Sequence, residues 1–417
     1  MRELTAPATC DVAIVGGGMV GASLALALAA LPLQVVVIEA TPPEDDGQPS
    51  FDTRTTALSN GTRRVFEGLG VWDEICREAT PIRRIHVSDR GRFGSAVIDA
   101  AEQGIAALGY VVENRVIGRA LWRRLRLSER TRILSPASVT AATAGAASVR
   151  LEVGAAAALE ARLVVAADGA GSLVRAAAGV GAERWDYGQT AVICQVTPER
   201  FHEHVAYERF TPTGPIAMLP APDGRVGVVW TLAPDEAARV LALPAEAFLS
   251  ELQQCFGWRL GALRAVAARV AYPLALTRAA AEQAPRTAII GAAAQGLHPI
   301  AGQGFNLGLR DAATLAEVLA DAAGEDAGAA QLLDRYAQWR HSDRRALIAF
   351  TDGLVRVFGS PLKSVQLARN LGLVLFDLSP PAKSALSRLS LGFAGRQPRL
   401  ARGLPLLEAN DLRGRQP

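Results

Sequence analysis

The chain has 417 residues, of which half are hydrophobic and 20% are charged, so it can bury a large core. Its 44 basic and 41 acidic side chains leave a net charge of only +3, which argues against a nucleic-acid-binding protein. Four scattered cysteines without a C-x-x-C pair argue against a zinc or other metal site, and no secretory pattern opens the chain. We therefore expect a cytoplasmic protein without a metal.

A strand, a helix and a second strand are predicted near the N-terminus. Residues 12–15 and 33–38 are short apolar runs that suit strands buried on both faces, and residues 19–30 between them are rich in Ala and Leu. A transmembrane helix is the alternative for this uncharged stretch, but its three consecutive glycines and Pro32 argue against one. The pattern is typical of the first β-α-β unit of a dinucleotide-binding fold.

The turn of this unit has the spacing G-x-G-x-x-G, formed by Gly16, Gly18 and Gly21. In such a turn the first glycine allows a tight bend, the second lets a pyrophosphate approach the backbone, and the third lets the helix pack closely on the strand. Glu39 ends the second strand, where a carboxylate can accept hydrogen bonds from ribose hydroxyls. These four residues predict a dinucleotide site at the helix N-terminus.

Arg54 follows this unit and is a second candidate for cofactor binding. Residues 41–50 have the composition of an exposed loop, and residues 62–69 are predicted to form a helix. An arginine between them can reach a phosphate or the ribityl part of a cofactor. The alternative is a surface arginine paired with Asp52.

A further buried strand is predicted over residues 162–167, and it delivers Asp168 and Gly169 at its carboxyl end. Ligands of doubly wound sheets bind at such strand ends, so both residues join the candidate site. The segments before this strand are predicted as a hairpin, a helix and two or three strands, over residues 82–98, 110–127 and 132–153 respectively.

An antiparallel sheet is predicted over residues 189–272, where short apolar runs alternate with turn residues, with one helix at residues 246–256. Tyr207 and residues 215–220 are candidates for lining a substrate cavity, because the low charge of this segment suits an apolar aromatic substrate. The buried-strand pattern resumes at residues 287–290.

A second glycine-rich segment covers residues 291–311 and lacks the Lys of a GxxxxGK phosphate loop. A helix is predicted to begin near Gly304, and its positive N-terminus suits the carbonyl oxygens of a planar ring. His298 is the titratable residue of the loop. The alternative is a structural loop that caps a core helix.

The chain is predicted to be helical from residue 334 to near residue 393. Between residues 354 and 406 it has one acid, Asp377, and eight basic residues, which are Arg356, Lys363, Arg369, Lys383, Arg388, Arg396, Arg399 and Arg402. Such a segment is either the solvated face of packed helices or a surface that docks on anionic membranes.

Three of these segments together resemble the class A flavoprotein monooxygenases. They are GGGMVG with Glu39, ADGAGSLVR, and HPIAGQGFNLGLRD. Further segments, including FDTRTTAL, YERFTPTGPIAMLP and FGWRLG, are similar to the ubiquinone-biosynthesis hydroxylases, and most of all to the 2-polyprenyl-6-methoxyphenol hydroxylases. The resemblance covers nearly the whole chain and implies an α/β, FAD-binding Rossmann-like fold of the glutathione-reductase type, with an inserted antiparallel β-sheet substrate domain and C-terminal helices.

The resemblance also implies how the domains and the FAD site are laid out. It places the FAD-binding domain at residues 1–80, 109–180 and 277–340, the substrate domain at 81–108 and 181–276, and a helical basic region at 341–417. It assigns the cofactor site, from the ADP half to the flavin ring, to Gly16, Gly18, Gly21, Glu39, Arg54, Asp168, Gly169, Gly302, Gln303, Gly304, Phe305 and Asn306. Ala292 departs from the family pattern, which has Asp or Asn there, and loses one hydrogen bond worth ~1 kcal/mol.

The activity implied is hydroxylation of a 2-polyprenyl-6-methoxyphenol-type ring with O2 through a flavin hydroperoxide, with NAD(P)H or another reductant as electron donor. His298 is the candidate base, and a loop-bracing histidine is the alternative. The polyprenyl tail implies peripheral contact with the inner face of the cytoplasmic membrane and allows contact with other ubiquinone-biosynthesis proteins, without nucleic acid. Two alternatives stay open: a flavin monooxygenase of another aromatic substrate, such as a soluble aromatic acid, and a non-catalytic scaffold subunit of a membrane-associated biosynthetic complex.

Overall fold

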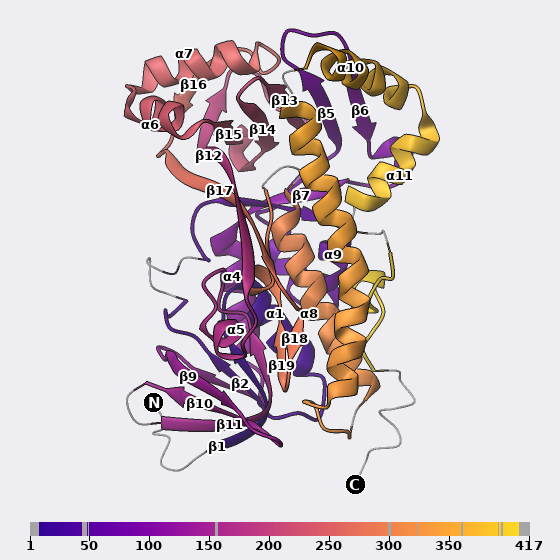
Figure 1. Cartoon of the computed structure of the whole chain (residues 1–417). Coiled ribbons are helices and arrows are strands. Elements are labelled where there is room, and N and C mark those ends of the chain that lie inside the picture. The colour runs from indigo at the N-terminus through magenta and orange to yellow at the C-terminus, as the bar shows by residue number, and fades with distance from the viewer. Residues whose placement is uncertain are drawn as a thin grey trace.

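Two large sheets, one above the other in Figure 1, organise the chain. The computed structural model describes residues 8–43, 48, 50–154, 157–298, 302–322, 324–359, 362–390, 392 and 395–407. The lower sheet contains the dinucleotide-binding segments, and the upper sheet contains the segment predicted as an insertion.

The lower sheet has strand order β18-β19-β11-β1-β2-β8, and β10 and β9 extend it beside β11. The strands are β1 (Ala8–Val15), β2 (Val35–Ile38), β8 (Thr131–Leu134), β9 (Val139–Ala144), β10 (Val149–Val153), β11 (Ala157–Ala166), β18 (Gln283–Ala284) and β19 (Thr287–Ile289). The pairs β1–β2, β1–β11, β2–β8 and β11–β19 are parallel, so their carboxyl ends meet at one edge. The strands predicted for this sheet are confirmed.

Both faces of the lower sheet are buried, which explains its uninterrupted apolar strands. The helices that surround it are α1 (Met19–Leu28), α4 (Asn114–Leu125), α5 (Leu173–Ala177) and α8 (Gln303–Asp321). Val12 and Ile14 belong to a core with residues of α1, α4 and α8. Ala13 and Val15 point the other way, into a second core with residues of β10 and α5. The alternation follows from the two-residue period of a strand.

The upper sheet has strand order β20-β17-β12-β15-β14-β13-β5-β6, with β16 beside β12. The strands are β5 (Arg84–Asp89), β6 (Ser95–Asp99), β12 (Ala182–Pro198), β13 (Val205–Thr211), β14 (Gly214–Pro220), β15 (Val226–Leu232), β16 (Leu263–Val266), β17 (Val270–Ala279) and β20 (Gln295–Gly296). The predicted antiparallel sheet is confirmed, and the predicted hairpin β5–β6 joins it through a parallel pairing of β5 with β13.

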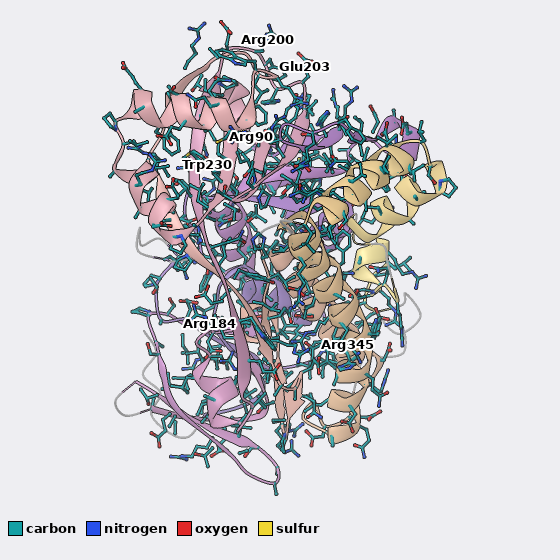
Figure 2. The ribbon with its side chains drawn as sticks, turned by 45° about the horizontal axis from the view of Figure 1, so that its top comes forward. Arg90, Arg184, Arg200, Glu203, Trp230 and Arg345 are labelled. Carbon is teal, nitrogen blue, oxygen red and sulfur yellow. The ribbon has the colours of Figure 1, made fainter. Side chains whose placement is uncertain are left out.

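Two helices, α6 (Pro234–Ala242) and α7 (Ala245–Phe256), cover one face of the upper sheet. Trp230, labelled in Figure 2, packs edge-on against Phe248 of α7 with ring centroids 5.7 Å apart. The sequence predicted α7 but not α6, because α6 is only nine residues long and opens with the turn-like pair Pro234–Asp235. The opposite face of this sheet is turned toward the lower half of the molecule.

A small three-stranded sheet, in order β3-β7-β4, lies between the two large sheets. Its strands are β3 (Thr55–Ser59), β4 (Thr80–Ile82) and β7 (Gly109–Glu113), and α2 (Asn60–Gly68) and α3 (Trp72–Ile75) follow β3. The prediction of one helix over residues 110–127 is wrong in its first part, because β7 occupies that part before α4 begins. Tyr110 and Val111 suit a strand, and their pairing with β3 and β4 is a contact distant in sequence.

Three C-terminal helices, α9 (Ala330–Gly359), α10 (Lys363–Asp377) and α11 (Pro380–Ser390), confirm the predicted helical segment. The long helix α9 runs from the lower sheet up to the upper one (Figure 1), where Phe358 stacks on Phe210 of β13 at 3.5 Å between ring centroids. A buried ion pair joins α9 to α8, since Arg340 Nε lies 2.7 Å from Asp311 Oδ1 and neither side chain is exposed.

The basic residues of the C-terminal segment are mostly engaged within the fold. Arg369 forms a buried ion pair with Asp89 at 2.6 Å, and Arg399 lies 2.7 Å from Asp321. Arg396 stacks on the ring of Trp339. Within the described part of the segment, these arginines therefore do not form the continuous basic surface that its composition suggests.

Candidate functional site

The turn between β1 and α1 lies at the carboxyl edge of the lower sheet. Gly16 has φ +102°, and a side chain there would overlap the backbone carbonyl of Ala167 after β11. A side chain at Gly21 would overlap the carbonyl oxygen of Gly16, so the helix contacts the turn directly. Gly18 differs, because a Cβ added there would meet only Ser50 among the described residues, 3.0 Å from its Oγ. The turn thus provides the bend, the open approach and the close packing that its spacing predicts.

Glu39 lies at the end of β2 and is 8% exposed. Its Oε2 accepts a hydrogen bond from the Gly17 N–H at 2.5 Å, and its Oε1 accepts one from the Thr41 N–H at 2.9 Å. On the other side of the turn, Trp122 of α4 donates from its indole N–H to the Gly17 carbonyl at 2.8 Å. The carboxylate is therefore held beside the glycine turn. Trp122 could not be predicted from the sequence, because it is 105 residues from its partner.

Asp168 and Gly169 form the neighbouring turn, after β11. Asp168 Oδ2 accepts from the Leu173 N–H at 2.8 Å, and Asp168 Oδ1 accepts from the Ser172 hydroxyl. Ser172 accepts in turn from the Arg175 N–H at 3.0 Å, so both side chains serve to begin α5. We expect this motif to contact a pyrophosphate through its backbone rather than through the carboxylate.

Arg54 forms the ion pair with Asp52 that the alternative predicts. Its guanidinium also lies 4.8 Å from the ring centroid of Tyr272, on β17 of the upper sheet. Asn114 donates to Asp52 at 3.2 Å. The pair therefore lies between the two sheets rather than on the outer surface, and it remains beside the space where the resemblance places the flavin.

The start of α8 is clamped to the small sheet by Asn306. Its Oδ1 accepts from the Ser59 N–H at 2.9 Å and from the Thr62 hydroxyl at 2.7 Å. Its Nδ2 donates to the carbonyls of Ala57 and Gly302 at 2.9 and 2.8 Å. Gly302 precedes the helix with φ +60°, which favours glycine. With four bonds to the protein, the Asn306 side chain positions the helix rather than a ligand.

The first turn of α8 is open to a ligand on one side. Gly304 is exposed, and no described atom lies within 4 Å of a Cβ added there. Gln303 is buried, and Phe305 stacks on Phe66 of α2 with ring centroids 6.1 Å apart. The N-terminal N–H groups of this 19-residue helix and its dipole suit a planar ring that carries negative charge.

His298 is 1% exposed and meets the ring of Tyr187 edge-on at 5.2 Å. Burial lowers the pKa of its imidazole to about 4, so the side chain is neutral near pH 7. A base with that pKa is poorly matched to a phenol, whose pKa is about 10. The geometry favours the alternative that His298 braces the loop. Residues 299–301 of the same loop lie outside the described residues.

The starts of α1 and α8 have no side-chain cap on their N-terminal N–H groups. Ser59 caps α2 and Ser172 caps α5, each accepting from a backbone N–H of its helix. By contrast, α1 and α8 begin after Gly18 and Gly302, which have no side chain to act as a cap. Other helices, α4, α6 and α7 among them, also lack a side-chain cap, so it is the glycine turns before α1 and α8 and the carboxylate of Glu39 that fit the pyrophosphate, the ribose and the ring of FAD.

Comparison with known proteins decides the family. A model of the FAD binding domain family matches residues 9–351. The chain is 41% identical over 408 residues to the ubiquinone hydroxylase UbiL of Rhodospirillum rubrum, covering 96% of this chain and 95% of the relative. It is 35% identical to the 3-demethoxyubiquinol 3-hydroxylase of Escherichia coli, covering 92% and 98%. The chain belongs to the ubiquinone-biosynthesis hydroxylase group of FAD-dependent monooxygenases.

Solved structures support the fold of this hydroxylase. The p-nitrophenol 4-monooxygenase PnpA of Pseudomonas putida DLL-E4 aligns with a TM-score of 0.77 at 20% identity, covering 94% of this chain and all of PnpA. The flavin-dependent monooxygenase PieE, solved with FAD and substrate, aligns with a TM-score of 0.69 at 16% identity, covering 94% and 73%. The predicted fold class, with its FAD-binding part, substrate sheet and C-terminal helices, is confirmed.

The cofactor of the hydroxylase is FAD, which supplies the redox chemistry that transfers one oxygen atom of O2 to an aromatic ring. We expect Glu39 to bind the ribose and the N-terminus of α1 at Gly18 to bind the pyrophosphate. We expect the N-terminus of α8 at Gly304 to lie under the flavin ring.

Ala292 gives a direct test of the cofactor site. It lies in the short helix η3 (Gly291–Ala293) and is exposed, so a longer side chain has room. Ala292→Asn should tighten FAD by about 5- to 10-fold, because one regained hydrogen bond is worth ~1 kcal/mol. Titration of the apoprotein with FAD measures this, with Ala292→Leu as a control that adds bulk without a polar group. Equal affinity of the Asn and Leu variants would show that position 292 does not face the cofactor.

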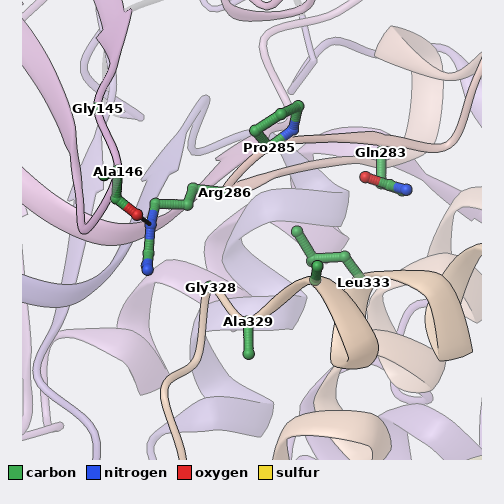
Figure 3. Close-up of a pocket in the computed structure, with 9 residues that line it drawn as sticks. Gly145, Ala146, Gln283, Pro285, Arg286, Gly328, Ala329 and Leu333 are labelled. Atoms are coloured by element: carbon green, nitrogen blue, oxygen red, sulfur yellow. Dashed lines mark hydrogen bonds between the residues drawn. The ribbon is translucent and has the colours of Figure 1, made fainter.

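The pocket drawn in Figure 3 is a separate feature. It has a volume of about 540 Å³ and is lined by residues of the β9–β10 turn, the β18–β19 turn and the start of α9. Arg286 is its charged residue, and it is engaged by Asp326 at 2.7 Å and by the Ala146 carbonyl at 2.7 Å. The pocket lies at the amino end of β19, away from the edge where α1 and α8 begin, so it is not the FAD site.

The structure of the upper sheet corrects part of the prediction of substrate-lining residues. Tyr207 points to the face covered by α7, where its ring meets Phe256 at 5.4 Å, so it does not line the space over the FAD-binding part. On β14, Ile216 and Met218 are also on the α7 side, and only Pro215, Ala217 and Leu219 point the other way. Alternate residues of this segment therefore face the site.

Proposed function

We propose that this monooxygenase hydroxylates a polyprenylated phenol of ubiquinone biosynthesis, of the 2-polyprenyl-6-methoxyphenol type. The names of the relatives at 41% and 35% identity support the pathway. The substrate class is supported by one feature of the structure, the face of the upper sheet that looks toward the FAD-binding part. The electron donor in this proposal is NAD(P)H or another reductant.

This substrate-facing surface is nearly free of charge. On β12, β13, β14 and β15 the residues in the α7 core alternate with those of the opposite face. The opposite face of these four strands consists of Ala191, Ile193, Gln195, Ala206, Glu208, Phe210, Pro215, Ala217, Leu219, Gly227, Val229 and Thr231. Eleven of these twelve side chains are uncharged, and the exception is an acid.

This composition argues against the alternative that the enzyme hydroxylates soluble aromatic acids. A carboxylate substrate needs a guanidinium or ammonium group in the site. None of the twelve positions provides one, and Glu208 would repel an anionic ring. Arg54, which lies over Tyr272 of the same sheet, is paired with Asp52. A neutral, electron-rich phenol with an apolar tail suits the surface better.

A comparison of two substrates, each given separately to the enzyme, tests the proposed function. The FAD-loaded enzyme is given a short-chain 2-prenyl-6-methoxyphenol or 4-hydroxybenzoate, with reductant and O2, and the products are measured by mass spectrometry. We expect the phenol to gain one oxygen and the acid to be left unchanged. Hydroxylation of the acid alone would refute the substrate class, and hydroxylation of neither would mean that the enzyme acts on another ring.

Helix α10 has an apolar surface that suits docking on the membrane, where the lipid tail of such a substrate lies. The exposed residues described on this helix are uncharged: Ser364, Leu367, Ala368, Leu371, Gly372 and Leu375. The four leucines at positions 367, 371, 375 and 378 are 54%, 48%, 66% and 73% exposed. No helix within the described ranges has the length and apolarity to cross a membrane. We therefore propose peripheral docking through this leucine face rather than through the C-terminal arginines.

Replacing two of these leucines should weaken vesicle binding. In the Leu371→Gln/Leu375→Gln variant we expect at least about tenfold weaker binding, because burying each leucine in the interface contributes roughly 1–2 kcal/mol. Flotation with liposomes measures it, and Leu127→Gln serves as a control, since Leu127 is 71% exposed on the lower half. If the double variant and the control float equally well, α10 does not dock on the bilayer.

A further inference from the structure

Glu208 is the single charged residue among the twelve strand positions of the substrate-facing surface. It follows Tyr207 on β13, and because side chains alternate along a strand, Glu208 points away from α7. Directly opposite it are Ala217 on β14 and Val87 on β5. Val229 lies one strand further along the same row. The carboxyl group is thus placed among apolar side chains.

No hydrogen bond or ion pair joins this carboxyl group to the residues that the structure describes. The charged groups on the surrounding elements are held in pairs of their own. They include Asp89 with Arg369, Asp352 with Arg356, Asp52 with Arg54, and Glu113 with Arg115. Glu113 also accepts a long hydrogen bond, 3.4 Å, from the Gln195 amide of this surface. A carboxyl group without a partner in apolar surroundings costs stability when it ionises. The carboxyl group of Glu208 forms no contact that stabilises the described fold, so we expect it to serve a ligand.

The surface that carries Glu208 shares a neighbour with the start of α8. A Cβ added at Gly227 would lie 3.0 Å from Thr55 Oγ1 on β3, so the surface rests on that strand. Ala57, two residues further along β3, packs in the same cluster as Leu219 and Ala206. A Cβ added at Gly302 would lie 3.1 Å from the Ala57 Cβ. A single strand therefore separates the substrate-facing surface from the place assigned to the flavin ring.

The upper end of α9 closes the same space beyond Glu208. Phe210, two residues further along β13 and on the same face, stacks on Phe358 of α9 at 3.5 Å. Glu208 thus lies between this aromatic pair and Ala206, which is buried against the small sheet. An aromatic ring held over the flavin between these walls would bring its hydroxyl group within reach of strand β13.

We propose that Glu208 accepts the hydrogen bond and then the proton of the substrate's phenol hydroxyl, and so activates the ring. In this step the phenol O–H bond breaks, a bond from the proton to a carboxylate oxygen forms, and the electron pair stays on the phenolate oxygen. No oxidant or reductant takes part. A phenolate donates more electron density to its ring than a phenol does, which favours attack on an electrophilic oxygen. The inference rests on the proposed substrate class.

The surroundings of Glu208 suit this role. Desolvation by the surrounding protein raises the pKa of its carboxyl group to about 7, and the side chain is half-buried rather than sealed off, so it stays accessible to a ligand. The raised pKa brings the base closer to the phenol and still leaves it ionised at slightly alkaline pH. His298 has a pKa of about 4 and is the weaker base of the two.

Replacing Glu208 by Gln keeps the shape and removes the charge. We expect kcat/KM for the prenylated phenol to fall by about 100-fold or more in the FAD-loaded enzyme. The wild-type kcat/KM should rise with pH to a plateau above about 7, and Glu208→Gln should lose this dependence. Glu208→Asp should keep the dependence with a lower plateau. Glu246→Gln, at an exposed position on α7, is the matched control and should match the wild type.

Binding gives a readout that does not depend on turnover. The wild type should bind the phenol more tightly than its methyl ether, which has no proton to give, and Glu208→Gln should lose this preference. The change in flavin absorbance on titration measures both. If Glu208→Gln keeps the preference and the pH profile, the inference is wrong while the proposed function stands. If the wild-type enzyme does not hydroxylate the phenol at all, the proposed function fails, and the inference fails with it.

The pH dependence of protein stability tests the environment of Glu208 without any substrate. Its pKa in the folded state lies above the ordinary value of 4.5, so the folded protein keeps a proton that the unfolded chain releases. Wild-type stability should therefore fall as the pH rises from about 4.5 to about 7, and Glu208→Gln should lack this contribution. The difference in Tm between the two proteins should grow in favour of the variant between these pH values. A difference that stays constant would show a solvated carboxylate and overturn the inference.

Discussion

Gly18→Val should give a folded protein that binds no FAD. Among the described residues an added Cβ meets only Ser50, whose hydroxyl can turn aside, so the fold tolerates a side chain there. The same side chain would occupy the path of the pyrophosphate to the N-terminus of α1. We expect an unchanged far-UV circular dichroism spectrum, a Tm close to that of the wild-type apoprotein, and no flavin absorbance after reconstitution.

Gly21→Val provides the contrast and Gly353→Ala the control. A side chain at Gly21 would overlap the Gly16 carbonyl, so this variant should lose stability as well as FAD. Gly353 lies in α9 with no described atom within 4 Å of an added Cβ, and its substitution should leave both unchanged. Flavin at wild-type stoichiometry in Gly18→Val would show that the pyrophosphate does not bind at this helix.

The second large effect is expected at the buried ion pair between α8 and α9. Asp311 accepts from Arg340 at 2.7 Å, from the Gly291 N–H at 3.1 Å and from the Gln295 amide at 2.8 Å. Neither charged side chain is exposed, so removing the charge of Asp311 leaves Arg340 buried with Asp343, at 2.5 Å, as its remaining acidic partner. We expect Asp311→Asn to lower the free energy of unfolding by about 3 kcal/mol, the low end of the range for breaking a buried ion pair. Urea denaturation of the apoprotein measures it.

The same substitution should also weaken FAD binding, because Gly291 begins η3, next to Ala292 and the loop before α8. The control is Glu251→Gln, which breaks an exposed ion pair with Arg239 and should cost no more than about 1 kcal/mol. Equal losses in the two variants would mean that the Asp311–Arg340 pair is solvated and contributes no more than a surface pair.

The sequence was sufficient for features set by local chemistry. The G-x-G-x-x-G spacing located the turn at Gly16, because only close backbone packing and a positive φ require glycine there. The apolar runs located the strands of the lower sheet, since they are buried on both faces. By contrast, β7 was mistaken for the start of a helix, because its pairing with β3 joins residues about fifty positions apart. Propensity alone does not record such a contact.

The substrate-facing surface needed the structure for a similar reason. The alternation along β13 is visible in the sequence, but a shift of one residue exchanges the two faces. The low charge of the segment predicts Tyr207 at the site, whereas the packing of α7 places Tyr207 on the far face and Glu208 on the face of the site. The C-terminal arginines were counted as surface charge, although Arg369 and Arg399 have acidic partners far away in the sequence.

One measurement tests the central claim most directly. The FAD-loaded enzyme is reduced without oxygen, mixed with a short-chain 2-prenyl-6-methoxyphenol and exposed to dioxygen labelled with heavy oxygen. The product is then analysed by mass spectrometry. A hydroxylase of this substrate class should place one labelled oxygen atom on the ring in a single turnover. Release of hydrogen peroxide with the phenol unchanged would contradict the proposed function.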